Sequence, residues 1–169
     1  MAAAQGAEQA VLGGWQLSTI TMVESGPFLT ASISPTLSQA NLNEAARGAI
    51  VRPDQIASCN IPDPTPDQWF NPNAFVPTPA GAGRTGDAGV GTCIGPRTVA
   101  VAGGLSKNFR LREKAKVRFE ATFTNLLNHP NFAAPAMNVS NPNFGVTNTV
   151  QGSENAGNRV GQLSLRIDF

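Results

Sequence analysis

Polar and apolar residues alternate strictly over the last eight positions of the chain, from Gln162 to Phe169. A period of two indicates a β-strand, because successive side chains of a strand point to opposite faces of the sheet. The apolar positions of this segment are Leu163, Leu165, Ile167 and Phe169. The pattern predicts a strand over about 159–169 with one apolar face and one polar face.

A second alternating segment lies within 115–126, and it is clearest between Lys116 and Thr124. The apolar positions here are Val117, Phe119, Ala121 and Phe123. The alternate positions carry Lys, Arg, Glu and Thr, which would lose their hydration at a high cost in a dry core. We therefore expect the polar face of this strand to meet water.

Weaker patterns predict two further strands. Over 98–111 apolar and polar residues alternate, except that Lys107 stands at a position where an apolar residue is expected. A lysine is tolerated there near an interface, because its long side chain can carry the charge toward polar surroundings. The charged link 112–115 is as short as a tight hairpin between two strands requires. A fourth strand is expected near 14–25, where β-branched residues are enriched.

Two long segments without a sustained period, 35–96 and 128–158, connect these strands. Strands of about ten residues with short turns on one side and long loops on the other are typical of a transmembrane β-barrel, whose apolar face meets lipid and whose polar face lines a wet lumen. A half-exposed soluble sheet alternates in the same way. The predicted fold class is therefore all-β and antiparallel. Two interpretations follow: a segment of a transmembrane barrel with long loops, or a soluble antiparallel β-sheet binding module.

Composition excludes other classes of protein. The 169 residues include 17 Gly and 13 Pro, the two poorest helix formers, which argues against a helical bundle. A formal net charge of +1 does not favour nucleic-acid binding, which needs a basic patch. No apolar run reaches the roughly 18 residues of a spanning helix. A hydrophobic share of 41% is too high for a wholly disordered chain.

The sequence contains no recognisable catalytic, cofactor or metal motif. His129 is the only histidine, and without a nucleophile motif such as GxSxG its Asn-His-Pro context favours a turn. Four carboxylates lack the spacing of a calcium loop and are expected to be solvated loop charges. They are Glu24, Asp54, Asp63 and Asp67. The glycine-rich segment 81–91 lacks the spacing of a phosphate loop and is expected to be flexible. We expect no enzymatic activity, no cofactor and no metal.

The two cysteines, Cys59 and Cys93, are too few to hold a metal and do not form a CxxC motif. They form either one disulfide in an oxidising compartment or two free thiols. The amino-terminal residues 1–14 contain no Lys or Arg, so they do not have the basic region of a secretory signal.

Residues 103–132 resemble the penultimate hairpin of TonB-dependent outer-membrane receptors, in particular the Oar-like group with a carboxypeptidase-regulatory-like domain. The positions that carry the resemblance in this segment are Lys107, Phe109, Phe119, Ala121, Asn125, Leu126, Asn128, His129, Pro130, Asn131 and Phe132. It continues downstream at Phe144-Gly145, Arg159, Gln162 and Phe169. Upstream it includes 13–28, Arg52-Pro53-Asp54, Trp69-Phe70-Asn71, Ala74-Phe75 and Gly95-Pro96.

This resemblance implies that residues 1–169 are the last four strands of a larger receptor barrel in the bacterial outer membrane. The family's signal peptide and plug domain have no counterpart in the sequence. The family places the carboxyl end in the periplasm, so both long loops are expected outside the cell and a Cys59–Cys93 disulfide is expected there. Phe169 is expected to act as the signal for the barrel assembly machinery.

The implied function is substrate uptake, to which this segment contributes wall strands and extracellular loops. The implied partners are outer-membrane lipid, the rest of the barrel and plug, the assembly machinery, and the TonB system through the amino-terminal part of the receptor. The transported substrate is not identified by the sequence.

Overall fold

The computed structural model describes residues 11–34, 51–79, 82–112, 115–152 and 157–169. The chain divides into two compact units. The first contains the long strands β1 (Trp15–Glu24), β8 (Thr98–Arg112), β9 (Ala115–Thr124) and β10 (Val160–Asp168). The second is formed by parts of 24–97 and 132–150. Among the described residues, no helix is long and apolar enough to cross a membrane.

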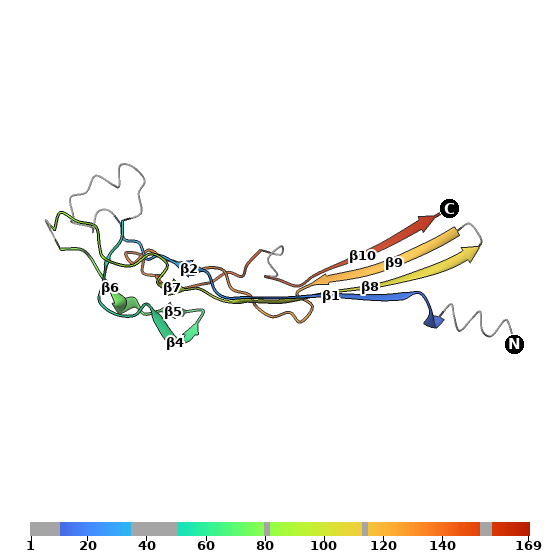
Figure 1. Ribbon diagram of the computed structural model, residues 1–169, viewed down its shortest axis with the longest axis horizontal. Helices are drawn as coiled ribbons and strands as arrows, with labels where there is room; N and C mark the ends of the chain where they lie inside the picture. The colour runs from blue at the N-terminus through green and yellow to red at the C-terminus, as the bar shows by residue number, and fades with distance from the viewer. Residues whose placement is uncertain (1–10, 35–50, 80–81, 113–114, 153–156) are drawn as a thin grey trace. The chain divides into compact units, whose positions relative to one another are not determined.

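The long strands form one four-stranded sheet in the order β1-β8-β9-β10 (Figure 1). β9 pairs antiparallel with both β8 and β10. β1 runs antiparallel to β8, because Gly14 accepts a hydrogen bond from Asn108 N–H at 3.0 Å while Ser18 Oγ donates to the Gly104 carbonyl at 3.3 Å. The sheet is all-β and antiparallel, as the sequence predicted.

The strands lie close to the positions that alternation indicates, and the small differences have local causes. β9 ends at Thr124 because Asn125 has a φ of 47°, a left-handed conformation that cannot continue a strand. β10 ends at Asp168, one residue before Phe169. In the link between β8 and β9, residues 113–114 lie outside the described part of the chain.

The cross-strand register places the side chains of the sheet in rows. Phe109 of β8, Val117 of β9 and Ile167 of β10 form one apolar row, and Leu105, Ala121 and Leu163 form another. The alternate positions form polar rows, such as Ser106, Glu120 and Ser164. Each strand therefore presents one apolar and one polar side, with the same side facing the same way across β8, β9 and β10.

Three asparagines organise the connection that follows β9, two of them through their side chains and the third through its backbone conformation. The Asn125 side chain accepts from His129 N–H at 3.0 Å and donates to the His129 carbonyl at 2.7 Å. The Asn131 side chain accepts from Val99 N–H at 2.8 Å and donates to the Val99 carbonyl at 3.0 Å, as a neighbouring strand would. Asn128 adopts a left-handed conformation with a φ of 53°. The side-chain amides of Asn125 and Asn131 take the place of ladder hydrogen bonds that the ending strand no longer provides.

The second unit contains short elements, and all of them except β2 lie within the segment 35–96 that was expected to be a long loop. They are β2 (Phe28–Leu29), β3 (Asp54–Gln55), β4 (Asn60–Thr65), β5 (Gln68–Phe70), the 3-10 helix η2 (Pro72–Ala74), β6 (Phe75–Val76) and β7 (Cys93–Ile94). They pair two by two: β2 with β7, β3 with β6, and β4 with β5. Parts of the expected loops, at 35–50, 80–81 and 153–156, lie outside the described residues.

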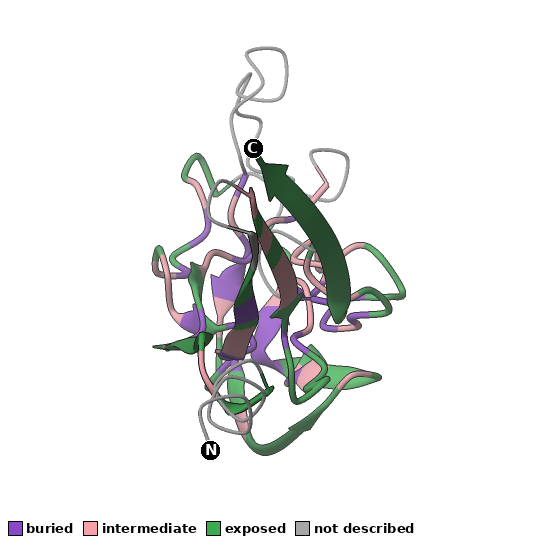
Figure 2. Ribbon diagram, turned by 90° about the vertical axis from the view of Figure 1, so that its right-hand side faces the viewer, coloured by how far each residue is buried: buried purple, intermediate pink, exposed green. Residues whose placement is uncertain are grey.

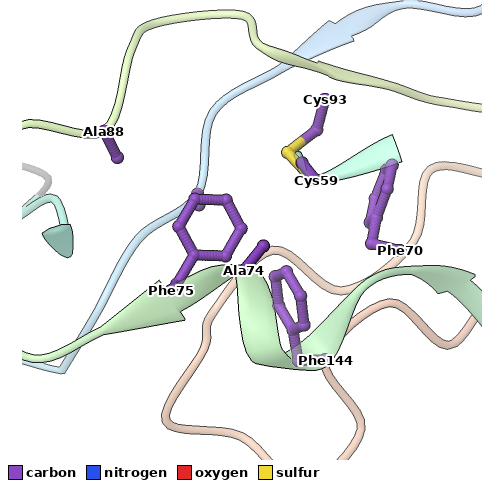
Figure 3. Packing of buried hydrophobic residues seen from close by; sticks show 8 residues of the cluster. Cys59, Phe70, Ala74, Phe75, Ala88, Cys93 and Phe144 are labelled. Carbon is purple, nitrogen blue, oxygen red and sulfur yellow. A yellow bond between two sulfur atoms is a disulfide. The ribbon is translucent and has the colours of Figure 1, made fainter. Parts of the chain in front are cut away.

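Distant chain segments meet in the core of this second unit. Phe144 packs against Phe75 with ring centroids 5.8 Å apart, and against Phe70 at 6.1 Å (Figure 3). Cys59 and Cys93 are joined by a disulfide with an S–S distance of 2.02 Å and lie in the same core. The segment 35–96 is therefore not a structureless loop where it is described.

Candidate functional site

The apolar face of the sheet is exposed rather than covered by other parts of the described chain. Leu163, Leu165 and Ile167 of β10 are 69%, 66% and 57% exposed. Figure 2 shows the strand that leads to the carboxyl terminus as exposed along its length. Leaving a large aliphatic side chain in water forgoes about 1.5–3 kcal/mol. A continuous surface of such residues therefore requires an apolar environment.

The residues predicted to face lipid lie together on this face. Direct cross-strand partners join Ile167 to Val117, Leu165 to Phe119 and Leu163 to Ala121. The remaining two are Phe123, opposite Gly161, and Phe169, which follows β10 and is fully exposed. The seven of these residues that lie in β9 and β10 form one continuous surface, and Phe169 follows it. Their contact with lipid remains a prediction.

Lys107 interrupts the apolar face near the turn between β8 and β9. Its Nζ lies 4.4 Å from the centre of the Trp15 ring and 5.0 Å from that of Phe109. It also donates to the carbonyl of Val11, which accepts a second hydrogen bond from Trp15 Nε1 at 3.0 Å. Only 4% of Lys107 is exposed. The two rings attract the cation through their electron-rich faces, so the charge is held by its neighbours rather than by water.

Sequence reasoning identified Lys107 as out of phase but missed this aromatic site. The only signal available was the Lys-x-Phe spacing of Lys107 and Phe109, since Trp15 lies 92 positions earlier in the chain. The pairing of β1 with β8 brings the Trp15 ring to the lysine.

The polar face carries an alternating network of charges. Arg118 Nη2 lies 3.4 Å from Glu120 Oε2 along β9, and Arg166 Nε donates to Asp168 Oδ1 at 2.8 Å along β10. Arg118 and Arg166 are themselves direct cross-strand partners. Arg118, Arg166 and Asp168 are exposed and Glu120 is half-buried, and because all four are charged the face suits water and not lipid.

An ion pair in the second unit corrects one prediction. Arg84 donates to both oxygens of Asp54, at 2.6 and 2.9 Å, and Asp87 N–H donates to the same carboxylate at 3.1 Å. The hydrogen bonds from Arg84 lower the pKa of Asp54 below its ordinary value of 3.8, against the opposing effect of burial. The interpretation of Asp54 as a solvated loop charge is therefore wrong, because this residue is buried and paired.

The glycine-rich segment 81–91 also differs from expectation. Gly81 lies outside the described residues, but Ala88 is fully buried in the core and Arg52 donates to its carbonyl at 2.7 Å. A Cβ added at Gly86 would lie 2.1 Å from the Pro53 carbonyl oxygen. Gly86 and Ala88 are therefore packed against the chain around Pro53, whereas 82–84 and Val90 are exposed.

The remaining candidate groups do not converge on a site. Asp63 and Asp67 are exposed, and Glu24 ends β1. His129 uses its backbone in the turn with Asn125. Within the ranges that the structure describes, no three His, Cys, Asp or Glu side chains are grouped closely enough to hold a metal ion.

The exposed apolar face, the wet polar face and the antiparallel register together define a wall segment of a membrane β-barrel. A family model described as "Outer membrane beta barrel domain" matches residues 1–162. The chain belongs to this outer-membrane β-barrel family, which places it in the bacterial outer membrane in association with its lipid. No curated protein and no solved structure matches the chain. The family assignment favours the barrel over the soluble binding module.

Proposed function

We propose that this outer-membrane protein is the carboxyl-terminal part of a TonB-dependent receptor of the Oar-like group. The observation that carries the proposal is the asparagine arrangement after β9. Asn125 and Asn131, two of the residues that resemble the family's hairpin motif, both make paired side-chain hydrogen bonds to backbone groups. A motif whose polar residues each satisfy a specific backbone position is a structural signature, which supports the resemblance.

A second group of family-like residues supports the same proposal. Phe144 packs in the core of the second unit, and Gly145 adopts a φ of 76° while its carbonyl accepts from Trp69 N–H at 2.8 Å. A Cβ at Gly145 would lie 3.1 Å from the backbone nitrogen of Phe70. Glycine is therefore required at the position where the motif has it.

In this proposal the chain acts in transport and not in catalysis, and it requires no cofactor. The sheet supplies part of the barrel wall, and the disulfide-linked unit lies outside the cell, where it contributes contacts to an unidentified substrate. Closure requires more strands, because the smallest bacterial barrels have about eight. The TonB system acts through a plug and coupling segment that belong to the amino-terminal part of such a receptor.

The barrel assembly machinery is a further proposed partner, and Phe169 is the residue proposed to engage it. We expect Phe169→Ala to reduce membrane-inserted protein several-fold. Gln162→Ala, on the polar side of the same strand, is the matched control and should leave insertion unchanged. Equal insertion of both variants would argue against a signal at Phe169.

An immunoblot of native outer membranes with an antibody against residues 158–169 tests the receptor proposal. A receptor predicts a band several times heavier than the 17.6 kDa of this chain. It also predicts that the band migrates differently with and without boiling, because a closed barrel resists detergent until it is heated. A band at 17.6 kDa that is unaffected by boiling would contradict the proposal.

A further inference from the structure

The polar face carries a concentration of positive charge at the end of the sheet near the β8–β9 turn. We call this the cationic band and define it by four side chains on three neighbouring strands: Arg110, Lys116, Arg118 and Arg166. Register places them on one face, because Arg110 is the partner of Lys116, and Arg118 is the partner of Arg166. The only carboxylates in the adjoining described positions of this face are Glu120 and Asp168.

The pair Arg118 and Arg166 is unusual for two neighbouring strands. Side chains directly opposite each other have Cβ atoms about 4.5–5.5 Å apart, and like charges in this position destabilise a sheet. Each arginine makes one ion-pair contact with a carboxylate two residues along its own strand, at 3.4 Å for Arg118 and 2.8 Å for Arg166. A guanidinium has five N–H donors, and the side chains of Arg118 and Arg166 remain 44% and 75% exposed beside these contacts.

The other two cations of the band are Arg110 and Lys116, and Lys116 also lies opposite Asp168 on the neighbouring strand β10. Arg110 and Lys116 are cross-strand partners, and neither makes an ion pair with another residue of the described ranges. Four cations therefore stand against two carboxylates. Asp168 lies opposite Lys116 but is already ion-paired with Arg166, so the band keeps an excess of positive charge, and an anion between its cations would reduce their mutual repulsion.

We propose that the cationic band binds oxyanion groups, the phosphate or carboxylate groups of a small solute, inside the barrel. This proposal rests on the proposed function in one respect, namely that the polar face of the sheet lines the lumen of a barrel. Arginine forks match phosphate and carboxylate oxygens in two-point contacts. A cleft lined by charge of one sign and bounded by low-dielectric walls also concentrates counter-ions. A cationic solute is repelled by the band, and an uncharged one gains nothing from it.

The test is a calorimetric titration of the protein in its native outer-membrane form, extracted in detergent micelles, with pyrophosphate and separately with citrate. We expect saturable binding of both probes, because the shared chemistry is the oxyanion. Tighter binding of pyrophosphate would identify phosphate-bearing solutes as the preferred source, and tighter binding of citrate would identify carboxylates. Raising the salt concentration from 50 to about 500 mM should weaken both, since the contacts are charged and exposed.

The double variant Arg118→Gln/Arg166→Gln should lose at least tenfold in affinity. The matched control is Arg97→Gln/Arg159→Gln, which removes the same charge from exposed positions outside the band and should change affinity less than twofold. Circular dichroism in the same micelles checks that each variant keeps its β-structure. If the first variant does not, Arg118→Lys/Arg166→Lys keeps the charge while removing the forks, and it should also weaken binding.

Absence of saturable binding to the wild-type chain would overturn the inference, and so would equal losses in the two double variants. The result is separable from the receptor proposal, which the immunoblot tests without any ligand. A receptor-sized, heat-modifiable band combined with no oxyanion binding would reject the cationic band alone.

Discussion

The ring of Phe123 lies over Gly161, its direct partner on the neighbouring strand. A Cβ built on Gly161 would lie 2.6 Å from Cε1 of that ring, closer than real contacts allow. The aromatic side chain therefore covers the backbone of a residue that has no side chain of its own. Cross-strand packing of this kind fixes the register of a strand pair.

Gly161→Ala should destabilise the folded sheet by about 1–3 kcal/mol, because the ring of Phe123 must move to make room. Urea titration of the chain in micelles, followed by circular dichroism, measures the effect. Gly152→Ala is the matched control, since an added Cβ there meets nothing within 4 Å. In a Phe123→Ala background, Gly161→Ala should lower the free energy of unfolding by less than half as much as it does in the wild-type chain. An unchanged loss of stability would contradict this packing.

The contact between Lys107 and Trp15 predicts a favourable coupling of about 1 kcal/mol, typical of a cation over an aromatic ring. A double-mutant cycle of Lys107→Met and Trp15→Leu isolates this coupling from the separate effects of charge and size. The same cycle with Lys116→Met in place of Lys107→Met should give a value near zero, because Lys116 lies on the opposite face. Equal coupling in both cycles would show that the ring does not hold Lys107.

The disulfide between Cys59 and Cys93 closes 34 residues and should stabilise the second unit by about 3–4 kcal/mol. Cys59→Ser/Cys93→Ser should therefore unfold at lower urea concentration, and a reducing agent should affect only the wild-type chain. Mass spectrometry after alkylation without reduction checks the bond directly. Two alkylated thiols in protein isolated from the outer membrane would contradict it.

The ion pair of Asp54 and Arg84 predicts acid sensitivity of the second unit. Because folding lowers the pKa of Asp54, the pair contributes stability above the ordinary value of 3.8, and this contribution is lost as the pH falls through the lowered folded value. Fluorescence of Trp69 in a Trp15→Phe background follows the unfolding. Asp54→Asn should remove the loss of stability at low pH that this pair causes. Asp63→Asn, at an exposed position, should leave that loss unchanged. A wild-type profile that is flat down to pH 2 would contradict the assignment.

The strands of the sheet were predictable from sequence because apolar and polar residues alternate along each strand. The alternation at Leu163, Leu165 and Ile167 needs no knowledge of the rest of the chain, and the same holds for β9. Register followed less directly, since only the short β8–β9 link restricts it.

The second unit was not predictable in this way. Its core joins residues that are isolated along the sequence, such as Phe75 and Phe144, and Ser32 bridges to Asn138 more than a hundred positions later. Short elements of two or three residues carry no periodicity. The burial of Asp54 likewise depends on Arg84, 30 positions away, and nothing local to either residue indicates the pair.

The central claim is that one face of the sheet meets lipid and the other meets water. Single cysteines placed from Gln162 to Ile167 in the chain in native outer membranes test it, with a membrane-impermeant maleimide and a lipid-soluble quencher of an attached fluorophore as readouts. We predict a period of two: Gln162→Cys, Ser164→Cys and Arg166→Cys react with the maleimide, while Leu163→Cys, Leu165→Cys and Ile167→Cys are quenched from lipid. Uniform reaction with the maleimide and no quenching at any position would contradict the account.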